Sequence, residues 1–237
     1  MFCGMRLVLF DIDGTLLWTD GAGRRAIQRA LVAEAGTAGP IDRYRFDGKT
    51  DPQIVQDLLS LAGHASAENA TVIQAVCRRY VDHLRTELER PTQATRVMAG
   101  IVDLLSALEP YEADRRALVG LLTGNVAPGA ALKLRSGGLD PARFRVGAYG
   151  SDSARRADLP AVAAARAAAL TGEIFTGSDV IIVGDTPDDV ACGRPIGARS
   201  VAVATGSYDV PALRTTGAAY VFENLTDTAA VLDAIFA

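Results

Sequence analysis

An apolar run that ends abruptly in acidic residues constrains the fold of this chain more than any other feature. Residues 7–10 read Leu-Val-Leu-Phe, and residues 11–15 read Asp-Ile-Asp-Gly-Thr. A run that is apolar at every position is typical of a strand buried on both faces, as in a parallel sheet with helices on each side. The glycine that follows the acids indicates a turn. We therefore expect functional chemistry where this strand ends.

Asp11 and Asp13 are separated by a single residue, so their carboxylates would repel each other if both were buried. A cation or a shared proton has to offset that repulsion. A hard divalent cation that takes oxygen ligands would do so, and Mg²⁺ is the first candidate. Because Asp-Gly is also ordinary turn chemistry, this motif alone leaves a plain surface turn open.

Length and composition narrow the alternatives. The 237 residues suit one large domain or a core with a smaller insert, and 49% hydrophobic with 22% charged residues is typical of a globular chain. The net charge of -4 provides no basic surface for nucleic acid. Neither a signal peptide nor an apolar stretch of membrane-spanning length is apparent. We expect a cytoplasmic protein, monomeric or homodimeric, without nucleic-acid or membrane partners.

The cysteines and histidines disfavour several kinds of site. Cys3, Cys77 and Cys192 are odd in number and widely spaced, which favours reduced thiols over a disulfide framework or a zinc site. His64 and His83 are the only histidines, so a Ser-His or Cys-His nucleophile is disfavoured. Carboxylates therefore have to carry any catalysis.

The order of hydrophobic patterns predicts an α/β core interrupted by helices. Residues 21–96 show helical spacing at 21–35 and 67–85, and Asp51-Pro52 offers an N-cap and a first-turn proline for a helix between them. From residue 98 onward the patterns alternate. Strands are predicted at 117–122, 143–149, 180–183, 200–204 and 220–222, and helices at 101–108, 128–135, 159–170, after Thr186 and at 227–235.

Repeated units of this kind predict an α/β fold with a doubly wound, Rossmann-like parallel sheet. The strand at residues 7–10 has to join the same sheet, because it is apolar on both faces. We therefore assign residues 1–20 and 97–237 to the core and residues 21–96 to an inserted all-α domain.

Two further strands are followed by polar residues. Thr123, Gly124 and Asn125 follow one strand, and residues 184–189, Gly-Asp-Thr-Pro-Asp-Asp, follow another. In open α/β sheets, ligands bind beyond the carboxyl ends of the strands. A threonine hydroxyl and an unobstructed backbone N–H can hold a phosphate, although Thr-Gly-Asn also makes a good turn and N-cap.

Taken in order, these motifs resemble those of the haloacid dehalogenase superfamily of phosphohydrolases. The matching segments are D-x-D-G-T at 11–15, T-G-N at 123–125 and G-D-T-x-x-D at 184–189. The helical insert is similar to the α-helical cap of the phosphoglycolate phosphatase and β-phosphoglucomutase-like branch. The resemblance spans essentially the whole chain.

The resemblance implies roles that suit the chemistry of these residues. Asp11 would attack phosphorus, and Asp13 would protonate the leaving oxygen and then activate water. Asp185 would bind Mg²⁺ with Asp11 and the backbone carbonyl of Asp13, and Asp189 would support that shell or orient a cationic residue. Asp188 competes for the last role, but the motif spacing favours Asp189. The phosphoryl group would lie against residues at two strand ends: Gly14, Thr15, Thr123, Gly124 and Asn125.

The third motif of the family is a lysine, and here the chain departs from it. The only lysines are Lys49, in the insert, and Lys133, which follows Thr123 too soon and is expected to be exposed. Residues 151–159 occupy the expected place, so we assign the cationic role to Arg156, with Arg155 as the alternative. A planar guanidinium can neutralise a phosphoryl group but is not equivalent to an ammonium.

Within the insert, residues 46–51 resemble the loop by which such caps reach the substrate. Lys49 would then contact a carboxylate or a second phosphate of the leaving group, and a solvated loop lysine is the alternative. Closure of the cap would exclude water and tie substrate choice to the insert.

The function that follows from the resemblance is a Mg²⁺-dependent phosphatase for a small phosphorylated metabolite, such as a phosphoglycolate-like compound or a sugar phosphate, acting through an aspartyl-phosphate. Two alternatives stay open. One is a phosphosugar mutase, and the other is a module that binds phosphate or Mg²⁺ without turnover.

Overall fold

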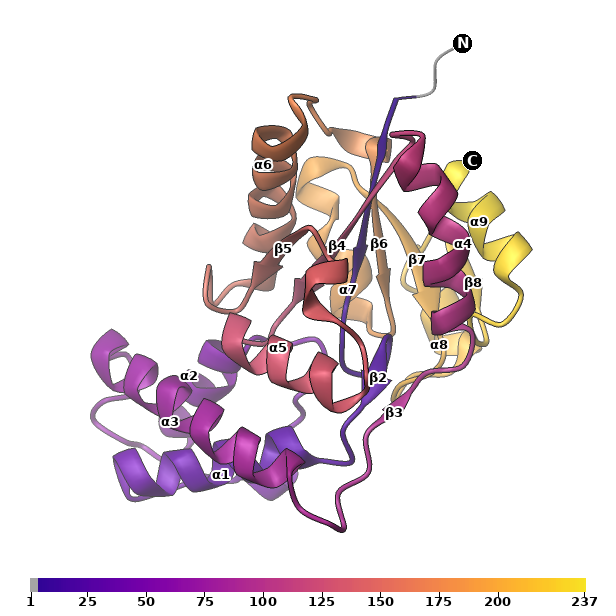
Figure 1. Ribbon diagram of the computed structural model, residues 1–237. Helices are drawn as coiled ribbons and strands as arrows, with labels where there is room; N and C mark the ends of the chain where they lie inside the picture. Colours follow the sequence, from indigo (N-terminus) through magenta and orange to yellow (C-terminus); the bar gives the residue numbers. More distant parts are fainter. Residues whose placement is uncertain (1–3) are drawn as a thin grey trace.

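A sheet of six parallel strands is the centre of the fold in the computed structural model, which describes residues 4–237 (Figure 1). The strand order is β5-β4-β1-β6-β7-β8. The strands are β1 (Arg6–Phe10), β4 (Ala117–Thr123), β5 (Val146–Tyr149), β6 (Val180–Gly184), β7 (Arg199–Val203) and β8 (Tyr220–Phe222). The predicted α/β class and its parallel sheet are therefore confirmed.

The strand β1 lies inside the sheet because its residues are apolar on both faces. It pairs in parallel with β4 on one side and with β6 on the other. Val8 and Phe10 belong to one hydrophobic cluster, whereas Leu7 and Leu9 belong to another on the opposite face. The three strands β4, β1 and β6 are therefore neighbours, and their carboxyl ends meet.

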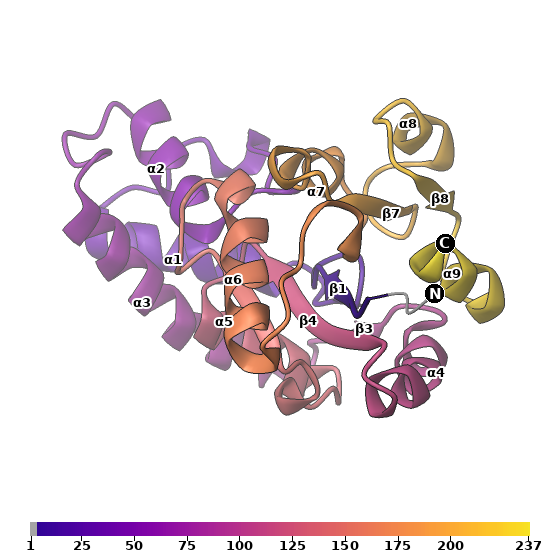
Figure 2. The same ribbon diagram turned by 90° about the horizontal axis from the view of Figure 1, so that it is seen from above.

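Helices cover both faces of the sheet (Figure 2). On the face of Val8, the packing helices are α4 (Ile101–Ala113), α5 (Ala127–Ser136) and α9 (Thr228–Phe236). On the face of Leu7, they are α6 (Leu159–Thr171) and α7 (Pro187–Cys192). The short α8 (Val210–Arg214) packs near β7 and β8 through Leu213. This arrangement leaves the carboxyl ends of the strands for loops and for the inserted helices.

Three helices between β1 and β4 form a segment with a hydrophobic cluster of its own, which we call the helical segment (residues 22–88). It consists of α1 (Ala22–Ala35), α2 (Asp51–Leu61) and α3 (Ala70–Leu88), drawn in indigo and purple in Figure 1. Its cluster includes Ile27, Leu31, Leu58, Tyr80 and Leu84. The chain leaves and re-enters the core through two paired strands, β2 (Leu17–Trp18) and β3 (Arg96–Val97).

The observed elements lie close to the predicted ones, with a few differences. The ribbon of β2 and β3 and the helix α8 were not predicted, because two-residue strands and a five-residue helix are too short to show periodicity. At the start of α2, the N-cap is Thr50, whose hydroxyl accepts a hydrogen bond from Gln53 N, and not Asp51. The division into two domains at 20/21 and 96/97 stays a prediction.

Two other expectations concern cysteines and the membrane. Cys77 and Cys192 are buried free thiols, and Cys3 lies outside the described residues. Within residues 4–237, no helix combines the length and the hydropathy needed to cross a membrane.

Candidate active site

The three neighbouring strand ends line one pocket of about 200 Å³. Asp11 and Asp13 follow β1, Thr123 precedes the turn after β4, and Asp185 follows β6. The backbone N–H of Asp11 donates to Val183 O, which holds the two acidic strand ends side by side. The predicted site residues in the pocket lining are Asp11, Asp13, Lys49, Thr123, Gly124, Asn125, Arg156 and Asp185.

A cluster of three buried carboxylates lies at the base of this site. Carboxylate oxygens of Asp11, Asp185 and Asp189 all lie within 4.8 Å of one another, and each of these residues is at most 5% exposed. Burial raises the pKa of Asp11 to about 6, and the charge of Arg156 offsets this only in part. Burial, with the charges of Asp189 and Asp11, raises the pKa of Asp185 well above its usual range. The cluster thus carries more negative charge than its surroundings stabilise.

Two glycines create the space that Asp185 occupies. Gly14 has a φ of 85°, and a Cβ added to it would lie 2.4 Å from Asp185 Oδ2. A Cβ on Gly206, which the sequence analysis did not single out, would lie 1.8 Å from the same oxygen. The hydroxyl of Thr15 donates to Asp185 Oδ1 at 2.9 Å. Gly14 thus leaves room for Asp185 and Thr15 bonds to it, and the substrate contact expected of both residues stays a prediction.

Asp189 has two partners that fix its carboxylate. Its Oδ2 accepts from the backbone N–H of Thr186 at 2.9 Å and from the Thr186 hydroxyl at 2.7 Å, which is a capping box at the start of α7. Its Oδ1 accepts from the guanidinium of Arg156. Asp188, the alternative for this role, is exposed and lies outside the pocket lining. The arrangement fits the proposal that Asp189 orients the cationic residue.

Arg156 lies between the nucleophile candidate and Asp189. Its Nη2 is 3.2 Å from Asp11 Oδ1 and also contacts Asp189 Oδ1. The charges of Asp189 and Asp11 outweigh burial and keep the pKa of Arg156 well above its usual value, so its charge is permanent. Arg155 instead leaves 79% of its side chain exposed and pairs with Asp158 at 3.5 Å. Of the two arginines, only Arg156 reaches the site.

Lys133 is a site residue that the sequence analysis placed wrongly. It was expected to be exposed, but it is 5% exposed, and its Nζ lies 2.7 Å and 2.6 Å from the two carboxylate oxygens of Asp13. Asn125 Nδ2 donates to Asp13 Oδ2 at 2.8 Å. The side chain of Asp13 therefore points to α5 and is not among the carboxylates of the buried cluster. A lysine ten residues after Thr123 lies on the helix that leaves the strand end, which is the only sequence signal for it.

The turn after β4 joins the core to the helical segment. The hydroxyl of Thr123 accepts from Asn125 Nδ2 at 2.8 Å, which orders this turn. Gly124 has no room for a side chain, since a Cβ there would lie 2.0 Å from Lys49 O. The backbone N–H of Asp51 donates to Gly124 O at 2.8 Å, and Val126 N donates to Asp51 Oδ2 at 2.8 Å. The start of α2 is thus fixed directly to the turn that carries Thr123 and Asn125.

Lys49 enters the pocket from the helical segment. Its Nζ is 4.0 Å from Asp57 Oδ2, and it lies 5.8 Å from the ring centroid of Tyr44. Its side chain is 28% exposed. Both partners belong to the helical segment. Lys49 lines the pocket, and the nearby carboxylate of Asp57 compensates part of its charge.

The buried acids fit a divalent cation. Asp11, Asp185 and Asp189 offer only oxygen ligands, and the sole buried cation that touches them among the described residues is Arg156. A hard cation such as Mg²⁺ takes carboxylate oxygens and would balance the remaining charge. Asp13 can join such a site through its backbone only, because Lys133 and Asn125 hold its side chain.

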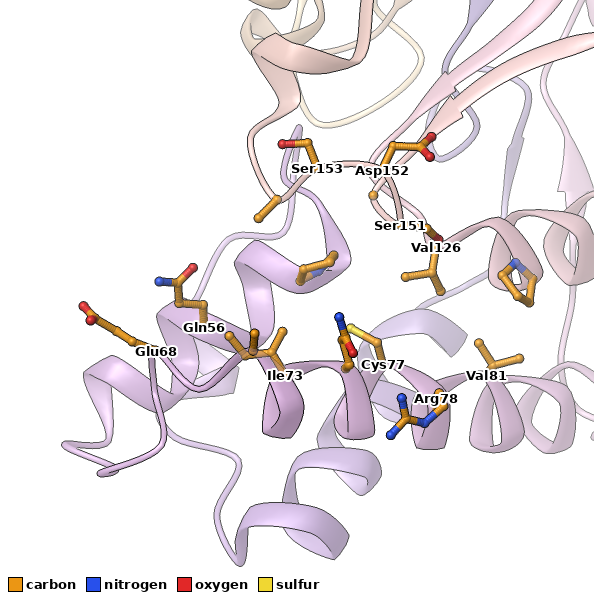
Figure 3. Close-up of a pocket in the computed structure, with 16 residues that line it drawn as sticks. Gln56, Glu68, Ile73, Cys77, Arg78, Val81, Val126, Ser151, Asp152 and Ser153 are labelled. Carbon is orange, nitrogen blue, oxygen red and sulfur yellow. The ribbon is translucent and has the colours of Figure 1, made fainter. Parts of the chain in front are cut away.

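A second and larger cleft of about 610 Å³ opens between α3 and the core loop at 150–154 (Figure 3). Figure 3 shows Ile73, Cys77 and Val81 of α3 facing Val126 and the loop residues across it. None of the predicted site residues lines it. Asp51 lines the smaller pocket and Pro52 the larger one, so the start of α2 separates them. Size alone therefore does not identify the reactive pocket.

Comparisons with known proteins support the resemblance to the haloacid dehalogenase superfamily. The model of the HAD-hydrolase-like family matches residues 157–228, which include the third strand end. No curated protein matches the chain. Among solved structures, a hydrolase from Pseudomonas syringae has a TM-score of 0.72 at 21% identity, covering 97% of this chain and 98% of its own.

Two other solved structures resemble the chain over nearly its whole length. A predicted phosphoglycolate phosphatase from Haemophilus somnus has a TM-score of 0.68 at 16% identity, covering 98% of this chain and 100% of its own. CbbY from Rhodobacter sphaeroides, in complex with phosphate, has a TM-score of 0.68 at 19% identity, covering 94% of this chain and 96% of its own. These likenesses show the fold, and with the family match they confirm the resemblance that the motifs indicated.

Proposed function

Starting from a chain with the fold and motifs of the haloacid dehalogenase-like hydrolases, we propose that it is a Mg²⁺-dependent phosphatase for a small phosphorylated metabolite. One observation carries the proposal. Asp11 lies beside Arg156 and two further buried acids, and Asp13 faces the same pocket of about 200 Å³ with a lysine and an amide on its carboxylate. The site thus combines a nucleophile, a candidate acid and base, and a buried cation.

The chain's own residues account for both halves of the reaction. A carboxylate oxygen of Asp11 forms a bond to phosphorus, the bond from phosphorus to the leaving oxygen breaks, and Asp13 transfers a proton to that oxygen. Water then attacks the aspartyl-phosphate while Asp13 takes a proton from it. Inorganic phosphate leaves, and Asp11 is regenerated. Arg156, fixed between Asp11 and Asp189, stabilises the charge on the phosphoryl oxygens.

Asp11 and Asp185, with Asp189 behind them, would hold the Mg²⁺, which when bound supplies positive charge beside the phosphoryl group. The hydroxyl of Thr123 and the backbone of Gly124 offer donors for phosphoryl oxygens at the neighbouring strand end. The helical segment acts as a cap that limits the access of water to this pocket, since residues 46–49, Asp51 and Tyr80 are part of its lining.

A panel of phosphate monoesters tests the proposal. Purified protein with Mg²⁺ is expected to release inorganic phosphate from at least one member, and Asp11→Asn is expected to lower kcat at least about a thousandfold, because an amide is not a nucleophile. Asp103→Asn, on the exposed side of α4, is the matched control. No release from any ester, or full activity of Asp11→Asn, would contradict the proposal. An isomerised ester without free phosphate would indicate a phosphosugar mutase instead.

A further inference from the structure

The hydroxyl of Tyr80 is buried without a hydrogen-bond partner among the described residues. The whole residue is only 1% exposed. It lies on α3 and lines the pocket that holds Asp11 and Asp13. A buried hydroxyl without a partner costs stability, so a residue of this kind inside a binding pocket points to a ligand that completes it.

Two glycines lie beside the ring and the hydroxyl of Tyr80. A Cβ on Gly23 of α1 would lie 3.8 Å from Tyr80 Oη and 3.4 Å from Lys133 Nζ. A Cβ on Gly129 of α5 would lie 3.3 Å from Tyr80 Cε1. Because Gly129 has no side chain, the ring can pack closely against α5. Because Gly23 has none, Tyr80 Oη and Lys133 Nζ lie next to a position on α1 that no side chain fills.

The charges around this space do not favour an anion. Lys133 is paired with Asp13 through both carboxylate oxygens. Burial, followed by the nearby charges of Asp51 and Asp13, raises the pKa of Tyr80 well above its usual value, so its hydroxyl stays protonated and donates. The other two cations from the helical segment and its neighbourhood that line the pocket are also engaged: Arg24 donates to Ile41 O and Tyr44 O, and Lys49 lies 4.0 Å from Asp57 Oδ2. A carboxylate or second phosphate of the leaving group would therefore find no cation here without a partner. A neutral hydroxyl can accept from Tyr80 and needs no such cation.

We propose that Tyr80, Gly23 and Lys133 form the subsite for the leaving group, and that the leaving group places a hydroxyl there. The substrate would then be the phosphate ester of a small polyol or sugar and not of a hydroxy acid. The pocket volume of about 200 Å³ restricts the leaving group to a few carbon atoms. This inference rests on the proposed phosphatase function.

The test compares an ester with free hydroxyl groups, an ester of the same chain length without them, and an ester with a carboxylate. Glycerol 1-phosphate, n-propyl phosphate and phosphoglycolate are assayed with the wild type, with Tyr80→Phe and with Tyr220→Phe, a control at a tyrosine that is 37% exposed. The wild type is expected to have its highest kcat/KM with glycerol 1-phosphate. Tyr80→Phe is expected to lower the ratio of kcat/KM for glycerol 1-phosphate over n-propyl phosphate about tenfold, the value of one hydrogen bond.

Tyr80→Phe keeps the ring and removes only a hydroxyl without a protein partner, so it should fold, and its melting temperature verifies this. If phosphate is released but the ratio is unchanged in Tyr80→Phe, or phosphoglycolate is the preferred ester, the subsite is wrong and the phosphatase function stands. If no ester releases phosphate, the function and the subsite fall together. An equal loss of the ratio in Tyr220→Phe would also overturn the subsite.

Discussion

Asp51 joins the helical segment to the core through its backbone and its side chain. Both groups bond to the turn that carries the candidate phosphate-binding residues: its N–H donates to Gly124 O, and its carboxylate accepts from Val126 N. Burial raises its pKa to about 7, and Lys133 and the Val126 N–H lower it only in part. Near neutral pH the Asp51 carboxyl therefore gains or loses its proton while it is buried between the helical segment and the core.

Stability should depend on pH through Asp51. Because its pKa is higher in the folded than in the unfolded chain, the folded state binds the extra proton, and its contribution is lost as pH rises toward 7. From pH 5 to pH 8, the free energy of unfolding of the wild type should fall by about 2–3 kcal/mol relative to Asp51→Asn. Urea denaturation at the two pH values measures this difference. The exposed control Asp103→Asn should show the same pH dependence as the wild type. If Asp51→Asn also shows the pH dependence of the wild type, the assignment to Asp51 is wrong.

At the scale of elements, α1 combines a helix start with a wall of the pocket. Gly21 precedes the helix in the left-handed conformation, with φ of 75°, and Gly23 lies within its first turn without any such need. Glycine at the second position weakens the helix relative to alanine. Gly23 is unfavourable for the helix and lines the pocket, which indicates that the lack of a side chain at this position serves the pocket.

Gly23→Ala should separate stability from function. A methyl group there would make ordinary contacts with Lys133 and Tyr80, so we expect the helix to be more stable by up to about 1 kcal/mol. The same methyl occupies the proposed subsite, so KM for glycerol 1-phosphate should rise several-fold. Thermal melting and steady-state kinetics test the two effects. The exposed Ala33→Gly in the same helix should lower stability without changing KM. An unchanged KM in Gly23→Ala would show that the substrate does not use this space, and a loss of stability would show that the added methyl does not fit against Lys133 and Tyr80.

Across the whole molecule, the buried acids link metal binding to stability. Asp11 and Asp185 come from different strands, so a cation held by both binds the folded chain and not the unfolded one. Mg²⁺ at about 100 times its Kd should add about 2.7 kcal/mol to the free energy of unfolding, seen as a higher melting temperature. Asp185→Asn should remove most of this shift, and NaCl at equal ionic strength should not reproduce it. The same shift in Asp185→Asn would mean that Mg²⁺ binds elsewhere.

The sheet and the meeting of its strand ends could be predicted because both follow from local patterns. Residues 7–10 are apolar at every position, which required a central strand, and the convergence of Asp11, Thr123 and Asp185 followed from parallel topology. The choice of Arg156 over Arg155 followed only from the spacing of the resemblance, and the structure shows which of them reaches Asp11.

The remaining site residues depend on contacts that no local pattern encodes. Lys133 meets Asp13 across 120 residues of sequence. Helix α5 has three alanines and one glycine among its ten residues, and this pattern gives no sign that its lysine is buried. Gly206 matters only because its Cα lies against Asp185. The hydroxyl of Tyr80 could not be identified from sequence, since a tyrosine at helical spacing is ordinarily a core residue.

The chain leaves the core through β2 and returns through β3, and these two strands pair with Trp18 opposite Arg96. The two ends of the helical segment therefore lie side by side, and none of the six strands of the main sheet comes from between them. A change within the helices of this segment that keeps the paired strands and the contacts of Asp51 with Gly124 and Val126 should therefore leave the sheet intact.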